Sequence, residues 1–190
     1  MKKTIYFALL CMVMSLTCCD KINDATSKEI KVNGVSFKFT AVSNAPAATR
    51  SAGEVELRAA TQTFSTTRTV LLSELGNPDV VEFANKIRNV NVSNTQITVT
   101  ADNGVNYTVE NLTVTAVGVA GSLAVPTFVM GGTVALPANT KSFTEAFVAQ
   151  LYTTATHSVA VTVTGKTDAP AGTTLNVNYE SDLVLTARIL

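Results

Sequence analysis

Apolar and polar residues alternate in short runs over most of the chain, which is the pattern of half-buried β-strands. These runs lie at residues 29–41, 54–59, 61–72, 95–101, 105–109, 112–116, 159–163, 175–179 and 183–189. Asn33-Gly34 interrupts the first run and predicts a two-residue hairpin turn. The alternation also predicts that four apolar residues face the core and that the threonines beside them form a more exposed surface. The apolar residues are Ile97, Val99, Val161 and Val163, and the threonines are Thr98, Thr100, Thr162 and Thr164.

Two segments have helical rather than alternating spacing. Asn77-Pro78-Asp79 combines an N-cap, a proline and an acidic residue, and the helix that it starts is expected to end near Arg88. Ser142-Phe143-Thr144-Glu145 has the pattern of a capping box, and Phe143, Phe147 and Leu151 form an apolar stripe. Residues 118–136 are apolar but contain glycine and proline, so strands in that segment are expected to be broken.

The two helical segments and the residues after them follow a similar order, with a constant offset of 64 residues. Phe83, Ile87, Ile97 and Val99 correspond to Phe147, Leu151, Val161 and Val163. This similarity suggests an internal helix–hairpin repeat, although any two helix–hairpin units look alike at this level. The predicted fold is mainly β: one domain over residues 29–190, built as an antiparallel two-sheet β-sandwich with two short helices.

The first 18 residues have the features of a signal peptide. Two lysines precede an apolar stretch at residues 5–16, which is too short to span a bilayer. The stretch ends in Leu16-Thr17-Cys18-Cys19, which resembles the bacterial lipobox, where a leucine lies three residues before the acylated cysteine. Cys19 fits this motif best, Cys18 is the alternative lipidation site, and a plain secretory leader is the other interpretation. Residues 19–28 are polar and are expected to form a short tether.

The whole chain resembles the uncharacterised cell-envelope lipoproteins of Bacteroidota. These proteins show the same order of leader, lipobox, polar tether and Val/Thr-rich β domain, in which a helix is followed by a V-x-V-T strand. The resemblance implies a β-sandwich that is lipid-anchored in the cell envelope, most simply at the outer membrane, and it implies no activity. The third cysteine, Cys11, lies inside the leader, so cleavage leaves no pair of cysteines for a disulfide.

Charge and aromatic content disfavour several kinds of partner. Fourteen basic and fourteen acidic residues give a net charge of zero, and loss of Lys2 and Lys3 with the leader leaves an excess of two acidic groups. The mature chain has no basic excess with which to bind nucleic acid or an anionic membrane surface. Sugar sites usually stack a ring on Trp or Tyr, and the chain has no Trp and only three tyrosines after the leader, so glycan binding is not favoured. The three are Tyr107, Tyr152 and Tyr179.

Motifs for catalysis and cofactor binding are absent from the sequence. His157 is the single histidine, and its position before a predicted strand is typical of a solvated side chain. No G-x-S-x-G motif, phosphate-binding loop or calcium-binding loop occurs. One histidine and no cysteine in the folded domain leave no ordinary ligand set for zinc. We therefore expect no enzymatic activity, no metal and no cofactor.

These observations favour a lipid-anchored cell-envelope protein with a non-enzymatic binding or accessory role, acting on an envelope protein partner. Two alternatives stay open. A fimbrial or adhesin subunit would be matured by cleavage after Arg50, which lies in a predicted loop. A carrier of lipids or other apolar ligands would use residues 117–130 to line a groove, although core packing explains the same residues.

Overall fold

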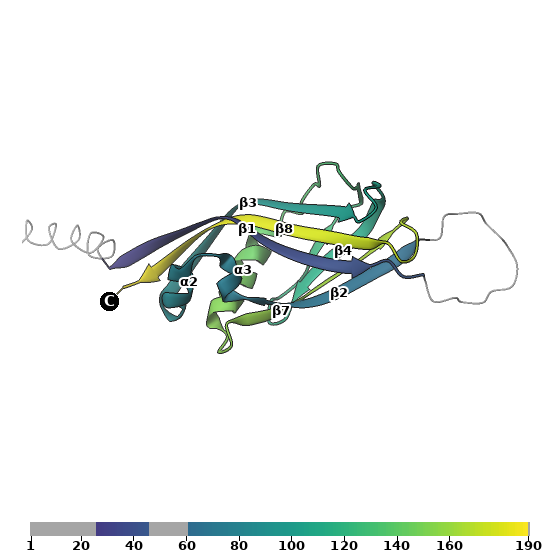
Figure 1. Ribbon diagram of the computed structural model, residues 1–190. Coiled ribbons are helices and arrows are strands. Elements are labelled where there is room, and N and C mark those ends of the chain that lie inside the picture. The colour runs from purple at the N-terminus through teal and green to yellow at the C-terminus, as the bar shows by residue number, and fades with distance from the viewer. Residues whose placement is uncertain (1–25, 46–60, 190) are drawn as a thin grey trace, which may run out of the picture.

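The structure, a computed structural model, describes residues 26–45 and 61–189. This part of the chain forms two antiparallel sheets that face each other, with two α-helices (Figure 1). The mainly β, two-sheet sandwich that the alternation predicts is therefore confirmed.

Sheet A has the strand order β1-β8-β3, and sheet B has the order β2-β7-β4-β5. The strands of sheet A are β1 (Ser27–Val42), β8 (Thr174–Arg188) and β3 (Ile87–Ala101). Those of sheet B are β2 (Gln62–Leu71), β7 (Ser158–Thr167), β4 (Thr108–Ala116) and β5 (Leu123–Val125), while β6 (Phe128–Val129) also pairs with β4. The helices are α2 (Pro78–Glu82) and α3 (Thr140–Thr153), and the 3₁₀ turns are η1 (Leu72–Leu75) and η2 (Ala84–Lys86).

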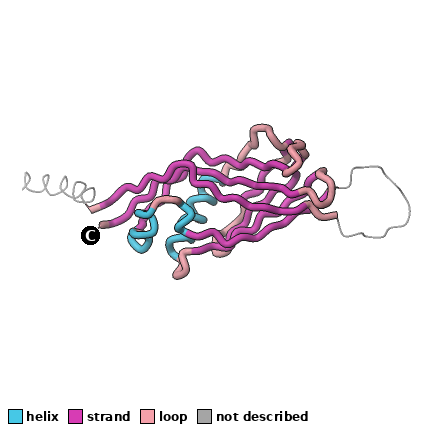
Figure 2. The backbone as a smooth tube through the Cα atoms, viewed as in Figure 1, coloured by secondary structure: helices cyan, strands magenta, loops and turns pink. Residues whose placement is uncertain are grey.

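The two ends of sheet A have different neighbours on the inner face. Sheet B covers one end, and the helices lie beneath the other end (Figure 2). Phe143, Phe147 and Leu151 of α3 are buried, as their spacing predicts. The Phe147 ring meets Phe37 of β1 edge to face, with 5.4 Å between the ring centroids. One hydrophobic core therefore continues from between the sheets to beneath α3.

Inward and outward positions on β3 and β7 follow the predicted alternation. Each of the four predicted core residues is at most 4 % exposed: Ile97, Val99, Val161 and Val163. The threonines between them are exposed on β3 and half-buried on β7. Because β7 lies between β2 and β4 whereas β3 is an edge strand, neighbouring side chains cover the outer face of β7 more closely.

The hairpin predicted at Asn33-Gly34 is wrong, because β1 continues through these residues as one strand beside β8. The two residues form a β-bulge, in which Gly34 has a φ of 63° and its N–H donates to Asp182 Oδ1 at 2.7 Å. A second bulge, on β3, places Asn94 at a φ of 50°, and its Nδ2 donates to Asp182 Oδ2 at 2.7 Å. An Asn-Gly pair suits either a turn or a bulge, and here the long partner strand β8 selects the bulge.

The predicted helix–hairpin units are not hairpins either. The chain passes from β3 in sheet A to β4 in sheet B, and later from β7 in sheet B to β8 in sheet A. Each unit keeps the order helix, strand, strand, but its strands pair with those of the other unit, β3 with β8 and β4 with β7. Alternation shows which face of a strand is buried and does not identify the strand's partner. An internal duplication stays a hypothesis.

The first predicted helix is present but shorter than expected. Asn77 caps α2, and its side chain accepts a hydrogen bond from the Asp79 N–H at 3.0 Å. The helix ends at Glu82, and η2 leads directly into β3 at Ile87, before the predicted end near Arg88. The buried strand β3 therefore takes over residues that the helical spacing had assigned to the helix.

The second helix begins earlier than predicted. α3 starts at Thr140 after Asn139, so the capping box predicted at Ser142 is wrong. The Ser142 hydroxyl instead donates to the Asn139 carbonyl at 3.0 Å within the first turn. Between the helices, β5 and β6 are short, as the glycines and proline predict. The strand predicted at residues 54–59 lies outside the described residues.

Candidate functional site

The residues predicted to carry modification lie outside the described ranges. Cys19, Cys18 and Arg50 are all among them, so lipidation and cleavage stay predictions. β1 begins at Ser27, inside the predicted tether, and the Ile189 N–H donates to the Thr26 carbonyl at 2.8 Å. The start of the first strand and the end of the last strand therefore lie together at one end of the sandwich.

His157 is more enclosed than a solvated histidine. The residue has a φ of 48° and is half-buried, and its Nδ1 is buried with no hydrogen-bond partner in the structure as described. Its carbonyl accepts from the Leu72 N–H at 2.8 Å, which links the start of β7 to η1. Residues 26–45 and 61–189 contain no group of three or more His, Cys, Asp or Glu that could hold a metal ion. The surroundings of His157 thus indicate a role in the chain connection.

The segment expected to line an apolar groove in a carrier mostly contributes to the core. Leu123, Val125 and Met130 are buried, whereas Val117 and Val129 are exposed. The apolar void between the sheets measures about 20 Å³, which is room for about one water molecule. Its lining consists of Phe37, Phe39, Val114, Ala116, Phe143, Phe147, Val161 and Tyr179. A void of this size gives no support to a carrier of acyl chains.

The outer face of sheet A holds a polar groove of about 410 Å³, which we call the amide groove. Strand pairing arranges its side chains in two rows across the three strands. One row is Lys38, Asn178 and Thr98, and the next is Thr40, Asn176 and Thr100. Asparagine is depleted in strands, so its presence at two successive outward positions of β8 is a sequence signal that the alternation alone did not reveal.

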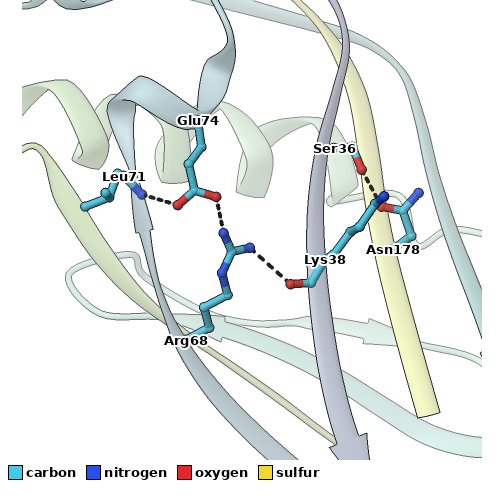
Figure 3. Close-up of polar contacts among 6 residues, drawn as sticks. All are labelled: Ser36, Lys38, Arg68, Leu71, Glu74 and Asn178. Atoms are coloured by element: carbon cyan, nitrogen blue, oxygen red, sulfur yellow. Dashed lines mark hydrogen bonds and ion pairs between the residues drawn. The ribbon is translucent and has the colours of Figure 1, made fainter. Parts of the chain in front are cut away.

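Hydrogen bonds from β1 orient both asparagines of the groove. The Ser36 hydroxyl donates to Asn178 Oδ1 at 2.5 Å, and the Thr40 hydroxyl donates to Asn176 Oδ1 at 3.2 Å. Figure 3 shows Ser36 and Asn178 facing each other across the two strands, with Lys38 on the same strand as Ser36. Each amide oxygen thus accepts a hydrogen bond from β1, and this orientation lets the amide N–H groups donate to a bound molecule.

A second cleft, which we call the edge cleft, adjoins the amide groove. It measures about 390 Å³ and is lined by Thr95–Thr98 of β3 and by Gly131–Val134 of the loop between β6 and α3. The side chains of consecutive strand residues point to opposite faces of a sheet. A cleft that contacts four consecutive residues of β3 must therefore run along the edge of that strand. Thr98 lines both hollows, which makes them one continuous polar surface.

A clamp between the two sheets holds the border of this surface (Figure 3). Arg68 of β2 forms an ion pair with Glu74, and its Nη1 donates to the Lys38 carbonyl at 3.0 Å. Glu74 Oε1 also accepts from the Leu71 N–H at 2.9 Å. Because Arg68 reaches the free edge of β1, it fixes the strand that carries Lys38 and Thr40.

The chemistry available at this surface is hydrogen bonding. The amide groove offers hydroxyl, amide and ammonium groups. Burial raises the pKa of the nearby Tyr179 phenol, whose hydroxyl lies in the core and bonds to Thr144. Tyr179 thus belongs to the packing beneath the groove.

The described part of the chain contains no helix that is both long enough and apolar enough to cross a membrane. No family model, curated protein sequence or solved structure matches this chain.

Proposed function

We propose that this protein is a lipid-anchored, non-enzymatic binding or accessory protein of the cell envelope, held in the outer membrane through Cys19. The observation that carries the proposal is the sequence Leu16-Thr17-Cys18-Cys19 at the end of a short apolar leader.

The position of the folded domain is consistent with such an anchor. β1 begins at Ser27, eight residues after Cys19, and eight extended residues span at most about 29 Å. A tether of this length would keep the domain close to the bilayer. Lys38 of the amide groove lies eleven residues further along β1, roughly 36 Å from its start. The groove and the edge cleft would then be accessible to a partner at a distance from the lipid.

Mass spectrometry of the mature N-terminal peptide tests the anchor. We expect the peptide to begin at an acylated Cys19, and Cys19→Ser to shift the protein from the membrane fraction to the soluble fraction. Cys18→Ser is the matched control, because it changes a neighbouring thiol that the cleavage removes. An unmodified peptide, or one that begins at Cys18, would contradict the assignment.

Site-specific crosslinking in cells tests the binding role. A photoreactive residue in place of Thr100, in the lining of the amide groove, should give one defined crosslinked species. The pair Asn176→Ala and Asn178→Ala should reduce its yield, whereas Thr67→Ala on the outer face of sheet B should leave it unchanged. Equal yields from the two variants, or turnover of a substrate by the purified protein, would argue against the proposed role.

A further inference from the structure

Charged side chains are distributed unevenly along the sandwich. We call the end formed by residues 26–31, 78–88 and 186–189 the tether end. It carries five basic and three acidic side chains: Lys28, Lys31, Lys86, Arg88 and Arg188 against Glu29, Asp79 and Glu82. The remaining described residues carry four basic and seven acidic side chains: Lys38, Arg68, Lys141 and Lys166 against Glu74, Asp102, Glu110, Glu145, Asp168, Glu180 and Asp182. The described part of the domain is therefore positive at the tether end, by two charges, and negative by three elsewhere.

Strand pairing and side-chain contacts bring the three segments of the tether end together. Ser27 pairs with Arg188 across β1 and β8, and Ile87 pairs with Ala187 across β3 and β8. Lys28 Nζ lies 2.7 Å from a carboxylate oxygen of Asp79, which attaches α2 to the start of β1. Figure 1 shows α2 at the same end as the first residues of β1 and the last residues of β8. The three segments thus lie at one end of the sandwich.

Three of the five cations at this end form no ion pair with an acidic group in the described part of the chain. Lys28 is paired with Asp79, and Lys31 lies 3.4 Å from Glu29. Lys86, Arg88 and Arg188 are exposed and form no ion pair with a carboxylate of residues 26–45 or 61–189. Unpaired cations are the ones available to an external anion.

Exposed apolar side chains accompany these cations. Val81 of α2 is 48 % exposed and Ile189 is 39 % exposed. Lys86 also lies over the ring of the half-buried Phe83, with its Nζ 5.9 Å from the ring centroid. Unpaired basic groups beside exposed apolar groups are the combination that binds the interface of an anionic bilayer.

We propose that the tether end docks on the anionic headgroups of the bilayer that holds the lipid anchor, and so orients the domain with its negative part away from the membrane. The inference rests on the proposed acylation of Cys19, because a tether of eight residues keeps this end near the surface. Attraction between charges acts over a Debye length of about 8 Å at physiological salt, which requires such proximity. The net charge of the mature chain concealed this possibility, since the fold separates charges that are mixed along the sequence.

Two matched labels test the contact in the acylated, full-length mature protein reconstituted in vesicles. Val81→Cys and Val105→Cys replace valines that are 48 % and 49 % exposed, at the tether end and in the loop at the opposite end of sheet A. Acylation of Cys19 makes the new thiol the single site for an environment-sensitive fluorophore. We expect the Val81→Cys label to gain emission in vesicles that contain phosphatidylglycerol, relative to pure phosphatidylcholine, and the Val105→Cys label to stay unchanged. A concentration of 0.5 M salt should abolish the gain, because salt at that level reduces the Debye length.

Charge removal gives the second arm of the test. The triple variant Lys86→Gln, Arg88→Gln and Arg188→Gln should lower the equilibrium constant for docking on phosphatidylglycerol vesicles by roughly tenfold or more. The emission gain of the Val81→Cys label reports this loss. The matched control removes three cations elsewhere, in the variant Lys38→Gln, Lys141→Gln and Lys166→Gln, and should retain the contact. Equal responses of the two labels, or of the two lipid compositions, would overturn the docking proposal alone. Protein that does not sediment with the vesicles lacks the anchor and would overturn the proposed function as well.

Discussion

The outer faces of the two sheets differ although their inner faces are alike. On sheet B the outward residues are mostly hydroxyls: Ser65, Thr164 and Thr113 form one row across the strands, and Thr67, Thr162 and Thr115 form the next. On sheet A the corresponding rows contain asparagine, lysine and carboxylates, and hydrogen bonds join side chains between strands. Both faces come from the same alternation of apolar and polar residues. The alternation therefore shows which face of a strand is exposed to solvent. The identity of the exposed residues shows where a strand is bulged or a site is formed.

The largest effect should come from placing a charge on an inner face. Val99 on β3 is 1 % exposed, so Val99→Asp buries a carboxylate without a partner and should destabilise the domain by several kcal/mol. Thr98→Asp on the exposed face should change stability by only about 0.5 kcal/mol. Urea melts of the two variants measure both values. Equal losses would mean that alternation does not indicate burial in this chain.

An equivalent pair of variants on sheet B, one inward and one outward, sharpens the comparison between the two sheets. Val163 is fully buried, so Val163→Asp should be as costly as Val99→Asp. Thr162 is half-buried, and its hydroxyl lies 2.8 Å from that of Thr67, so Thr162→Asp should cost more than Thr98→Asp. The gap between inner and outer variants should thus be narrower on sheet B, as denaturant titration would show.

Much of the fold could be predicted from the sequence because burial in a strand has a period of two. The inward valines, the Asn77 cap and the apolar stripe of α3 are all local signals, and the structure confirms them. The pairing of strands is a long-range property, so the passage from β3 to β4 between sheets could not be derived from local alternation. The hairpin predicted at Asn33-Gly34 failed for the same reason, since β8 lies far along the chain.

The candidate surfaces were less predictable than the fold. The amide groove depends on Lys38, Asn178 and Thr98, which belong to three strands and become neighbours through pairing. Asparagines at two successive outward positions could have been noticed, but the partners that orient them could not. The charge of the tether end likewise arises from three separate segments, whereas the sequence provides the total. The lipobox-like motif is local, and its interpretation stays a prediction.

A glycine on sheet B should give the next largest effect after the buried charges. A Cβ added at Gly165 of β7 would lie 2.5 Å from the Phe64 ring, which packs over that glycine from the adjacent strand β2. Gly165→Ala should therefore cost about 1–3 kcal/mol through overpacking. Adding Phe64→Leu should reduce the additional penalty of Gly165→Ala, because the smaller side chain leaves room. A double-mutant cycle by thermal melting checks this, and strictly additive losses would exclude the contact as the cause.

Asp182 on sheet A should make the stability of the fold depend on pH. Hydrogen bonds from Asn94 and from the Gly34 backbone hold the pKa of Asp182 below its ordinary value. A carboxylate with a lowered folded pKa stabilises the fold fully above its unfolded pKa, and this contribution is lost as the pH falls through the folded value. Asp182→Asn should therefore be less stable than the wild type at neutral pH, with the difference shrinking in strong acid. Urea melts across pH 2–7 would show a constant difference if Asp182 played no such part.

The smallest effect compares one side-chain hydrogen bond on each outer face. Ser36→Ala removes the donor to Asn178 Oδ1 at a half-buried position on sheet A, and such bonds contribute about 0.5–1.5 kcal/mol. Thr67→Val on sheet B removes the partner of Thr162, but Thr67 is exposed and a valine suits a strand, so the change should stay within about 0.5 kcal/mol. Each substitution removes one hydroxyl, so denaturant melts of the two variants compare the faces directly. A loss from Thr67→Val as large as that from Ser36→Ala would mean that the hydroxyl rows of sheet B are as interlocked as the amides of sheet A. Only the larger loss on sheet A is consistent with asparagines that are held in place, as the proposed binding role of the amide groove requires.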